Sequence, residues 1–387
     1  MLDTGLRQYA TDRQWEILQA IEEEGSGHAA ARKLGLSYGT VGNTKAAVLQ
    51  KAAKRGYAPE YDLKHTVPDG YKLKGASTLY KDGEPILQWV KSTVDDERQA
   101  AIIREMAVAM AEALPRAEPV AVRAATADNL ATVYPVGDAH LGMLGWHEEA
   151  GGDYDLAIGE RLLTGAIDHL VDVSPACDTA VVAFLGDLFH YDSFEAVTPA
   201  HRNLLDADGR FPKMVRVVIR TVRYMIHRAL EHHANVHVII EIGNHDPSSS
   251  VFLTECLHNI YELEPRVTID RSPSHYHYWR FGKSLLGITH GDKCKIDKLP
   301  LLMATDRPRD WGETEHRLWF TGHVHHDSVK EIEGVRCESF RVLPPTDAYA
   351  QNAGYRAGRD MKAVVFHKEF GEVARYVVNP KMLERAS

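Results

Sequence analysis

The sequence predicts an α/β protein in which a small helical head precedes a large α/β body. Three observations support this prediction. The chain has 387 residues, enough for two or three domains of ordinary size. From Asn129 onward, short runs rich in β-branched residues recur, and helical patterns lie between the first three runs. The first 60 residues show only helical spacing and turn signals.

The composition narrows the class of protein. With 44% hydrophobic and 26% charged residues, the chain matches a globular protein and excludes general disorder. No stretch approaches the ~18 to 20 apolar residues that cross a bilayer, and the first residues lack a signal layout, so we expect a cytoplasmic protein without a membrane partner. The four cysteines form no CxxC pair, which argues against a disulfide framework or a thiolate zinc site.

The head, residues 1–60, is predicted to contain a helix-turn-helix. Residues 12–24 carry apolar side chains at helical spacing, and a Gly-Ser-Gly segment ends that helix. Residues 28–34 and 36–43 are predicted to form two further helices joined by Gly35. This is the layout of a helix-turn-helix.

The head also differs in charge from the rest of the chain. The net charge of −9 argues against coating nucleic acid through bulk positive potential, yet residues 30–55 contain six basic and no acidic side chains. We therefore expect the head to bind DNA. The alternative is a three-helix packing module with a solvated basic face. The candidate DNA-binding residues are Arg32, Lys33, Tyr38, Thr40, Asn43 and Lys45.

Residues 61–125 are predicted to connect the head to the body. Their patterning is weak and includes several prolines. Within them we expect a short hairpin near Tyr71–Leu87 and a linking helix over Asp95–Ala113.

The body, residues 126–387, is predicted to have sheet strands at its centre. Helical patterns cover Leu156–Val171 and Met214–His233, and the His232-His233 pair is expected to complement the dipole of the second helix. Residues 329–378 have the pattern of further strands and turns. The first five strands are expected at Thr132–Val136, Thr179–Leu185, Val236–Ile242, Ser284–Thr289 and Leu318–Thr321.

Each of these five strands is followed by a turn that carries Asp, Asn or His. Because open α/β sheets build their sites at the carboxyl ends of strands, we expect the five turns to converge. Carboxylate oxygen, amide oxygen and imidazole nitrogen are ligands for Zn, Mn and Fe. One such fragment alone is more often a simple turn, but the ordered set predicts a metal centre. The candidate ligands are Asp138, His140, Asp187, Asn244, His290, His323 and His325.

Seven ligands are too many for one ion, so two divalent ions are expected, ~3.5 to 4 Å apart. We assign Asp187 as the carboxylate that bridges them. The first ion would also be held by Asp138, His140 and His325, and the second by Asn244, His290 and His323.

These motifs, in this order, resemble the signature of the calcineurin-like metallophosphoesterases. The resemblance covers about residues 129–366, and Gly186-Asp187-Leu188-Phe189-His190 is more similar to the SbcD-type (Mre11-like) DNA nucleases than to the protein phosphatases. The motifs that carry the resemblance are Asp138-x-His140, Gly186-Asp187-x-x-His190, Gly243-Asn244-His245-Asp246, His290 and Gly322-His323-x-His325.

The resemblance implies a four-layer α/β/β/α sandwich with two metal ions, commonly Mn, with Zn, Fe or Mg as alternatives. It also implies that His245 lies beside the scissile phosphate. The chain lacks a Gly-x-x-x-x-Gly-Lys-Ser/Thr motif, so a partner ATPase of that branch would act in trans. Related enzymes are often homodimers, which makes a dimer possible here.

A mechanism follows from this reading. Two cations lower the pKa of a water between them toward neutrality, which gives a hydroxide placed for in-line attack on a phosphodiester. His245, oriented by Asp246, would stabilise or protonate the leaving oxygen. His190 is a candidate for a similar supporting role, and packing near the site is its alternative role.

The predicted function is a metal-dependent phosphodiesterase, and specifically a DNA nuclease. One alternative is a phosphatase or a cyclic-nucleotide or small-molecule phosphodiesterase whose head serves only for assembly. An alternative of another class is a DNA-binding regulator whose hydrolase body is an inactive scaffold.

Overall fold

The computed structural model describes residues 2–55, 57–58, 71–81, 84–94, 126–346, 354 and 356–384. The chain divides into two compact units, residues 1–104 and 105–387. The predicted linking helix at 95–113 lies outside the described residues. Among the helices that the structure describes, none combines the length and apolar character needed to cross a membrane.

The first unit begins with four helical segments whose ends are set by capping residues. Thr11 and Gln14 form a capping box at the start of the first α-helix, and Ser26 and Ser37 cap the next two. Gly35 ends the second α-helix in the left-handed conformation, with φ of 62°. The segments are η1 (Thr4–Tyr9), α1 (Asp12–Glu23), α2 (Gly27–Leu34) and α3 (Tyr38–Lys54).

The predicted order of helix, helix, tight turn and helix is confirmed, but α3 is much longer than expected. It continues past Asn43 to Lys54 because the added residues are mostly Ala, Gln and Lys, which favour helix, and include neither Gly nor Pro. Its inner face packs Val41 against α1 and α2.

The predicted hairpin in the connector is also present. It pairs β1 (Tyr71–Lys81) with β2 (Glu84–Val94) in an antiparallel register, so the second strand runs seven residues beyond the expected Leu87. Trp89 lies opposite Ser77 in this register.

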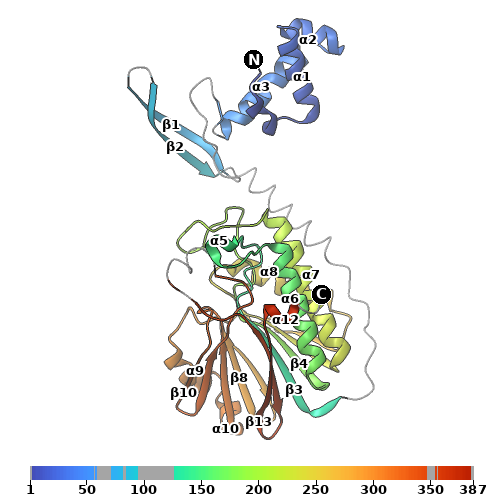
Figure 1. The fold of residues 1–387 in the computed structure, drawn as a ribbon, viewed down its shortest axis with the longest axis vertical. Coiled ribbons are helices and arrows are strands. Elements are labelled where there is room, and N and C mark those ends of the chain that lie inside the picture. Colours follow the sequence, from blue (N-terminus) through green and yellow to red (C-terminus); the bar gives the residue numbers. More distant parts are fainter. Residues whose placement is uncertain are drawn as a thin grey trace. The chain divides into compact units, whose positions relative to one another are not determined.

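The second unit contains two sheets (Figure 1). The first sheet has the order β13-β12-β3-β4-β5-β6, with β3 to β6 parallel and β12 antiparallel to both of its neighbours. Its strands are β3 (Ala127–Val136), β4 (Cys177–Phe184), β5 (Asn235–Ile240), β6 (Val267–Ile269), β12 (Met361–His367) and β13 (Gly371–Val378).

The second sheet has the order β10-β11-β9-β8-β7. Its three central strands are parallel, and both edge strands pair antiparallel. The strands are β7 (His277–Phe281), β8 (Ser284–Thr289), β9 (His316–Thr321), β10 (Ser328–Ile332) and β11 (Val335–Ser339).

Alternating side chains along the strands build the layers. In β4, Val182 and Phe184 face a core shared with helices, whereas Val181 and Ala183 face a second core between the two sheets. A third core covers the outer face of the second sheet, where Trp319 packs on α9. The four-layer α/β/β/α arrangement predicted for the body is therefore observed.

Helices cover both outer faces. The longest two, α6 and α7, lie side by side on the first sheet (Figure 1). Several elements had no distinct sequence pattern, including α8, which begins at a proline directly after Asp246. The helical segments of this unit are α5 (His147–Ala150), α6 (Leu156–Val173), α7 (Phe211–His232), α8 (Pro247–Ile260), η3 (Ile296–Lys298), α9 (Leu299–Asp306), α10 (Pro308–Glu313) and α12 (Pro380–Glu384).

The His232-His233 pair is buried. His232 lies in the last turn of α7, as predicted, but the prediction that His233 complements the helix dipole is wrong. The amide of Cys177 donates to Nδ1 of His233, and Nε2 of the same ring lies 2.8 Å from the Tyr134 hydroxyl. Burial lowers the pKa of His233 to about 3, so the ring is neutral and joins α7 to the sheet.

This buried ring predicts a loss of stability in acid. Unfolding returns the pKa of His233 to about 6.5, so the unfolded state binds a proton that the folded state excludes. Stability should fall as pH drops from about 6.5 toward about 3, by up to ~1.4 kcal/mol per pH unit from this group. Denaturant unfolding between pH 7 and 5 should give a shallower pH dependence for His233→Gln. The exposed His201→Gln is the control, and equal slopes in all three proteins would contradict the assignment.

Candidate metal centre

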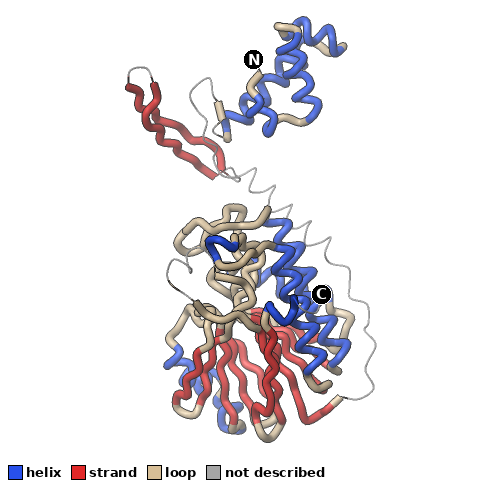
Figure 2. The backbone as a smooth tube through the Cα atoms, in the orientation of Figure 1, coloured by secondary structure: helices blue, strands red, loops and turns tan. Residues whose placement is uncertain are grey.

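Figure 2 shows loops gathered at one end of the two sheets. The predicted ligands lie in loops that follow strands of both sheets. Asp138 and Asp187 follow β3 and β4 of the first sheet, and Asn244 follows β5. His290 and His323 follow β8 and β9 of the second sheet. The site is thus built from the carboxyl ends of strands in both layers.

The first group joins three predicted ligands. Donor atoms of Asp138, His140 and His325 lie within 4.8 Å of one another. The His325 Nε2 is 3.0 Å from Asp138 Oδ2 and 3.3 Å from His140 Nε2. This matches the set predicted for the first ion.

The second group joins Asp187, His290 and His323, again with donor atoms within 4.8 Å. Asn244 completes it, because its Oδ1 lies 2.9 Å from His290 Nε2. The Nδ1 of His290 lies 2.8 Å from the Leu185 carbonyl oxygen, which fixes the ring. Asp187 belongs to this group only, so its role as a bridge stays a prediction.

Three imidazoles form a further group beside the first. Donor atoms of His140, His190 and His245 lie within 4.8 Å of one another. The His190 ring is buried, and burial followed by the neighbouring His245 lowers its pKa to about 3. His190 is therefore neutral in this arrangement.

The sequence predicts that Asp246 orients His245, but the structure shows a different partner. Its Nδ1 lies 2.8 Å from the backbone oxygen of His190, to which it donates. The Asp246 carboxylate instead accepts from the amides of Phe189 and Gly243, at 3.0 Å each. Asp246 thus ties two of the site loops together, and a backbone carbonyl orients His245.

The electrostatics of the site indicate a cation-binding site. Burial alone would lower the pKa of His290, but the Asp138 and Asp187 carboxylates raise it to about 10. Burial opposes charge on Asp138, yet His325 and His290 hold its pKa at about 2. Burial and the Asp187 charge raise the pKa of Asp246 to about 7. Because burial disfavours their negative charge, the carboxylates of this site need a positive partner, which a bound cation would supply.

The backbone is strained at the same residues. Among the described residues other than glycine, six have positive φ, and four of these are predicted ligands. Such conformations persist only when the surroundings fix them, and they concentrate at functional sites. The four are His140 (φ 41°), Asp187 (49°), His323 (67°) and His325 (55°).

Two glycines allow the loops to approach closely. A Cβ at Gly322 would lie 2.3 Å from Asp138 Oδ1. A Cβ at Gly243 would lie 2.0 Å from Asp187 Oδ1 and 2.2 Å from the Asp187 backbone nitrogen. Neither distance is possible without moving the backbone.

Gly243→Ala is therefore expected to displace the Asp187 loop. We expect a destabilisation of about 1 to 3 kcal/mol, as for other overpacked positions, together with weaker metal binding. Thermal unfolding and metal titration would measure both. Gly312→Ala is the matched control, because a Cβ there meets nothing within 4 Å. Wild-type metal affinity in Gly243→Ala would contradict this account.

The donor set fits a pair of divalent ions. It offers carboxylate, amide and imidazole donors, and no thiolate, which suits Mn, Fe or Zn. The facing nitrogens of His140 and His325, 3.3 Å apart, also lie at a separation typical of two ligands of one ion.

The predicted DNA-binding residues form a separate set on the first unit. All six are exposed, and α2 and α3 carry them on either side of the Gly35 turn. Lys33 pairs with Glu23 at 2.7 Å and Glu24 at 3.0 Å, so part of its charge is already engaged. The Tyr38 ring stacks on His28, with ring centroids 3.8 Å apart.

Some contributors to the site carried no sequence signal. Asp192 accepts from the amides of Ser248 and Ser249 at the start of α8, and so fixes the segment after His245. The backbone oxygen of His190, which orients His245, could not be found from side-chain patterns.

No family model and no curated protein matches the chain. Among solved structures, an archaeal phosphodiesterase is 16% identical with a TM-score of 0.32, covering 64% of this chain and 99% of its own. Vps29 complexed with zinc, from Entamoeba histolytica, is 12% identical with a TM-score of 0.28, covering 64% and 98%. A putative 5′-nucleotidase from Staphylococcus aureus is 12% identical with a TM-score of 0.30, covering 65% and 54%. Identities and TM-scores this low say nothing about activity, so the chemistry of this chain is argued from its own side chains.

Proposed function

We propose that the chain is a metal-dependent phosphodiesterase that hydrolyses DNA. One observation carries the hydrolase part of this proposal: two groups of carboxylate and imidazole donors converge at the strand ends of both sheets. When bound, a pair of divalent ions, with Mn as the first choice, would acidify a water and neutralise phosphate oxygens. Asp138, His140 and His325 would hold one ion, Asn244, His290 and His323 the other, and Asp187 both.

The residues around these ligands supply positioning and proton handling. Because Nδ1 of His245 donates to the His190 carbonyl, Nε2 is the ring atom that can face a substrate. His245 is only partly buried, so a leaving oxygen can reach this atom. Because Nδ1 keeps its hydrogen on the carbonyl, Nε2 carries a proton only in the imidazolium form, and that form would give the Nε2 proton to the leaving oxygen and return to the neutral ring. The buried His190 holds that ring from behind, through its backbone oxygen and by ring contact at 5.7 Å.

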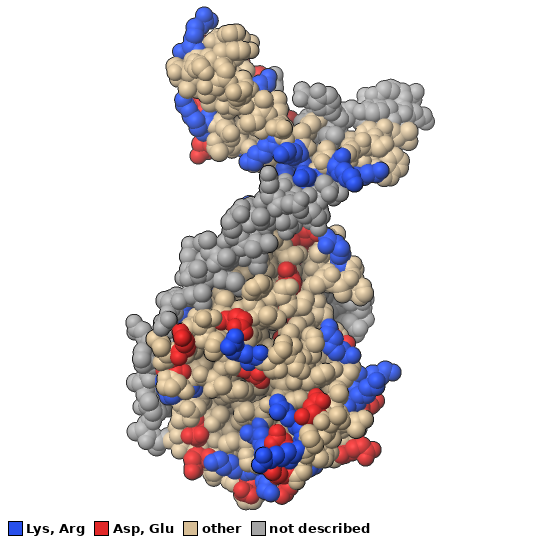
Figure 3. Space-filling model, turned by 180° about the vertical axis from the view of Figure 1, so that it is seen from behind, with Lys and Arg blue, Asp and Glu red and all other residues tan. Residues whose placement is uncertain are grey.

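The DNA part of the proposal rests on the head. A three-residue turn separates α2 from α3, and residues 30–55 carry only basic charges. Thr40, Asn43, Lys51 and Lys54 are spaced along one exposed stripe of α3, where they would meet phosphates or base edges. In Figure 3 the charged side chains visible on the head are mostly Lys and Arg, whereas both charges are mixed over the body.

The test uses the purified full chain, stripped of metal and reloaded with Mn, Zn, Fe or Mg in turn. Substrates are end-labelled single-stranded and duplex DNA and a generic aryl phosphodiester. The proposal expects cleavage of DNA that a chelator abolishes. Cleavage of the small ester with intact DNA would favour a small-molecule phosphodiesterase. No bound metal and no hydrolysis, with DNA retained, would favour a regulator with an inactive scaffold.

A further inference from the structure

The loop after β9 carries two predicted ligands in strained conformations. We define residues 322–327 as the histidine loop. His323 and His325 both adopt positive φ within it, although neither is glycine. Since such backbone persists only when its surroundings fix it, contacts at both ends of the loop must hold it.

The first end is held by the site itself. The Gly322 amide donates to the His290 carbonyl at 3.0 Å. The His323 amide donates to the Asp138 carboxylate, at 3.0 Å from each oxygen. These backbone contacts end before His325, whose ring reaches the site through its Nε2, 3.0 Å from Asp138 Oδ2.

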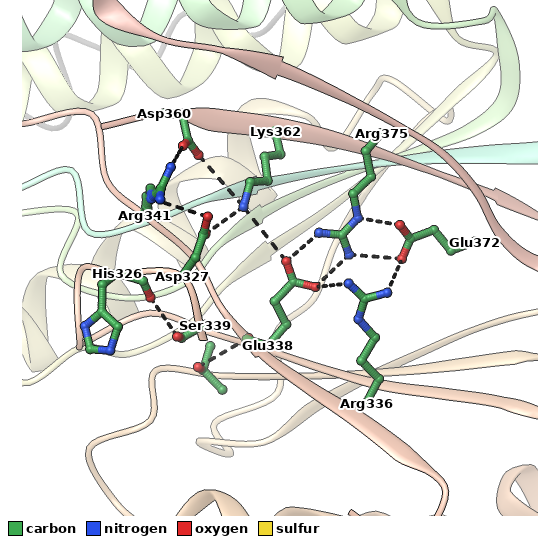
Figure 4. A network of polar contacts seen from close by, with 11 residues as sticks. His326, Asp327, Arg336, Glu338, Ser339, Arg341, Asp360, Lys362, Glu372 and Arg375 are labelled. Atoms are coloured by element: carbon green, nitrogen blue, oxygen red, sulfur yellow. Dashed lines mark hydrogen bonds and ion pairs between the residues drawn. The ribbon is translucent and has the colours of Figure 1, made fainter. Parts of the chain in front are cut away.

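The second end is held by residues outside the site (Figure 4). The Ser339 hydroxyl donates to the His326 carbonyl at 2.8 Å. The Lys362 ammonium donates to Asp327 Oδ1 at 2.6 Å, and Arg341 Nε lies 3.3 Å from Asp327 Oδ2. Two consecutive residues of the loop are thus fixed directly after His325.

Lys362 is the most buried cation at this end, with 9% of its side chain exposed. Three carboxylates surround it, but those of Asp360 and Glu338 lie at 3.9 and 4.0 Å. Arg341 pairs with Asp360 at 2.8 Å, and Arg375 pairs with Glu338 at 2.6 Å.

A buried ammonium persists only when it is well paired, because desolvation is costly. Each of the two more distant carboxylates has an arginine of its own, so the close partner of Lys362 is the histidine loop. The ion pair therefore links β12 of the first sheet to a loop of the second sheet.

We propose that Lys362, together with Ser339, is a positioning residue that sets the place of His325 in the metal centre. This inference rests on the proposed function, since it assigns a role toward the same ions. Residues that orient metal ligands typically change metal affinity by about 10- to 100-fold when removed.

The test compares Lys362→Met, Lys362→Arg and Ser339→Ala in the full chain. Calorimetric titration with Mn should show one of two binding steps weakened at least about 10-fold in Lys362→Met, with partial recovery in Lys362→Arg and a smaller loss in Ser339→Ala. Aryl-ester hydrolysis should need more Mn for half-activation and approach the wild-type rate at saturating Mn. In the metal-free protein, the imidazole NMR signals of His325 should shift.

Arg228→Met is the matched control. Arg228 is also a mostly buried cation, with 17% of its side chain exposed, and it pairs with Asp168, Asp172 and Glu231 on the helical layer. The Arg228→Met substitution should lower thermal stability without changing Mn affinity. If Lys362→Met is folded and binds both Mn ions as wild type does, the positioning role is wrong. If wild type itself binds no Mn, the proposed function fails, and this inference fails with it.

Discussion

Asp187→Asn is expected to abolish hydrolysis while the protein remains folded and retains DNA. Asp187 lies between the amide of His245, which donates to its Oδ1 at 2.8 Å, and the His290 ring, 3.3 Å from Oδ2. An amide removes the negative charge that two cations would share. The loss should exceed the roughly 10- to 100-fold typical of residues one step removed from a metal. Hydrolysis of the aryl ester and of DNA measures it.

His245→Ala provides the comparison for this result. It removes the proposed proton donor but none of the assigned ligands, so metal content should stay at the wild-type level while hydrolysis falls. DNA retention by both variants, measured by mobility shift in the presence of a chelator, should match wild type. Hydrolysis by Asp187→Asn at the wild-type rate would remove the basis for the metal-centred reaction.

Reversing two charges on the head is expected to weaken DNA binding strongly. Lys51 and Lys54 are exposed on the proposed DNA-facing stripe of α3, and no ion pair involving either is observed in the described part of the chain. If each contacts a phosphate, Lys51→Glu with Lys54→Glu should reduce the slope of log affinity against log salt by about 2. Fluorescence anisotropy with labelled duplex DNA at several salt concentrations measures this slope.

Arg13→Glu serves as the control for that experiment, because Arg13 lies on α1 and pairs with Glu16. Lys33→Glu should have a smaller effect than either test substitution, since Glu23 and Glu24 already engage part of the charge of Lys33. Hydrolysis of the aryl ester should be unchanged in all of these variants. An unaltered salt slope in the double variant would show that the head does not hold DNA.

Many of the site residues could be predicted because they come directly after buried strands in the sequence. Asp138 and His290 each come within two residues of a strand end, where a polar side chain has few structural reasons to be. The division into two groups of ligands was also predictable, because neighbouring strand ends share an edge. The left-handed backbone at His140 and Asp187 was not, since local sequence does not favour it and long-range contacts impose it.

The remaining misses have similar physical causes. The partner of His245 is a backbone oxygen, which every residue offers and no pattern singles out. The burial of His233 depends on Tyr134 and Cys177, which are 99 and 56 residues away along the chain. Strand β6 has only three residues, too few for a period of two to be visible.

The origin of the ligands in two separate sheets has a consequence for how the protein unfolds. Asp138, Asp187 and Asn244 belong to one layer, and His290, His323 and His325 to the other. A bound ion would cross-link the layers noncovalently, so neither layer could melt while the ion stays in place. Saturating metal should raise the melting temperature with the logarithm of its concentration, and it should make the two sheets unfold as one cooperative unit.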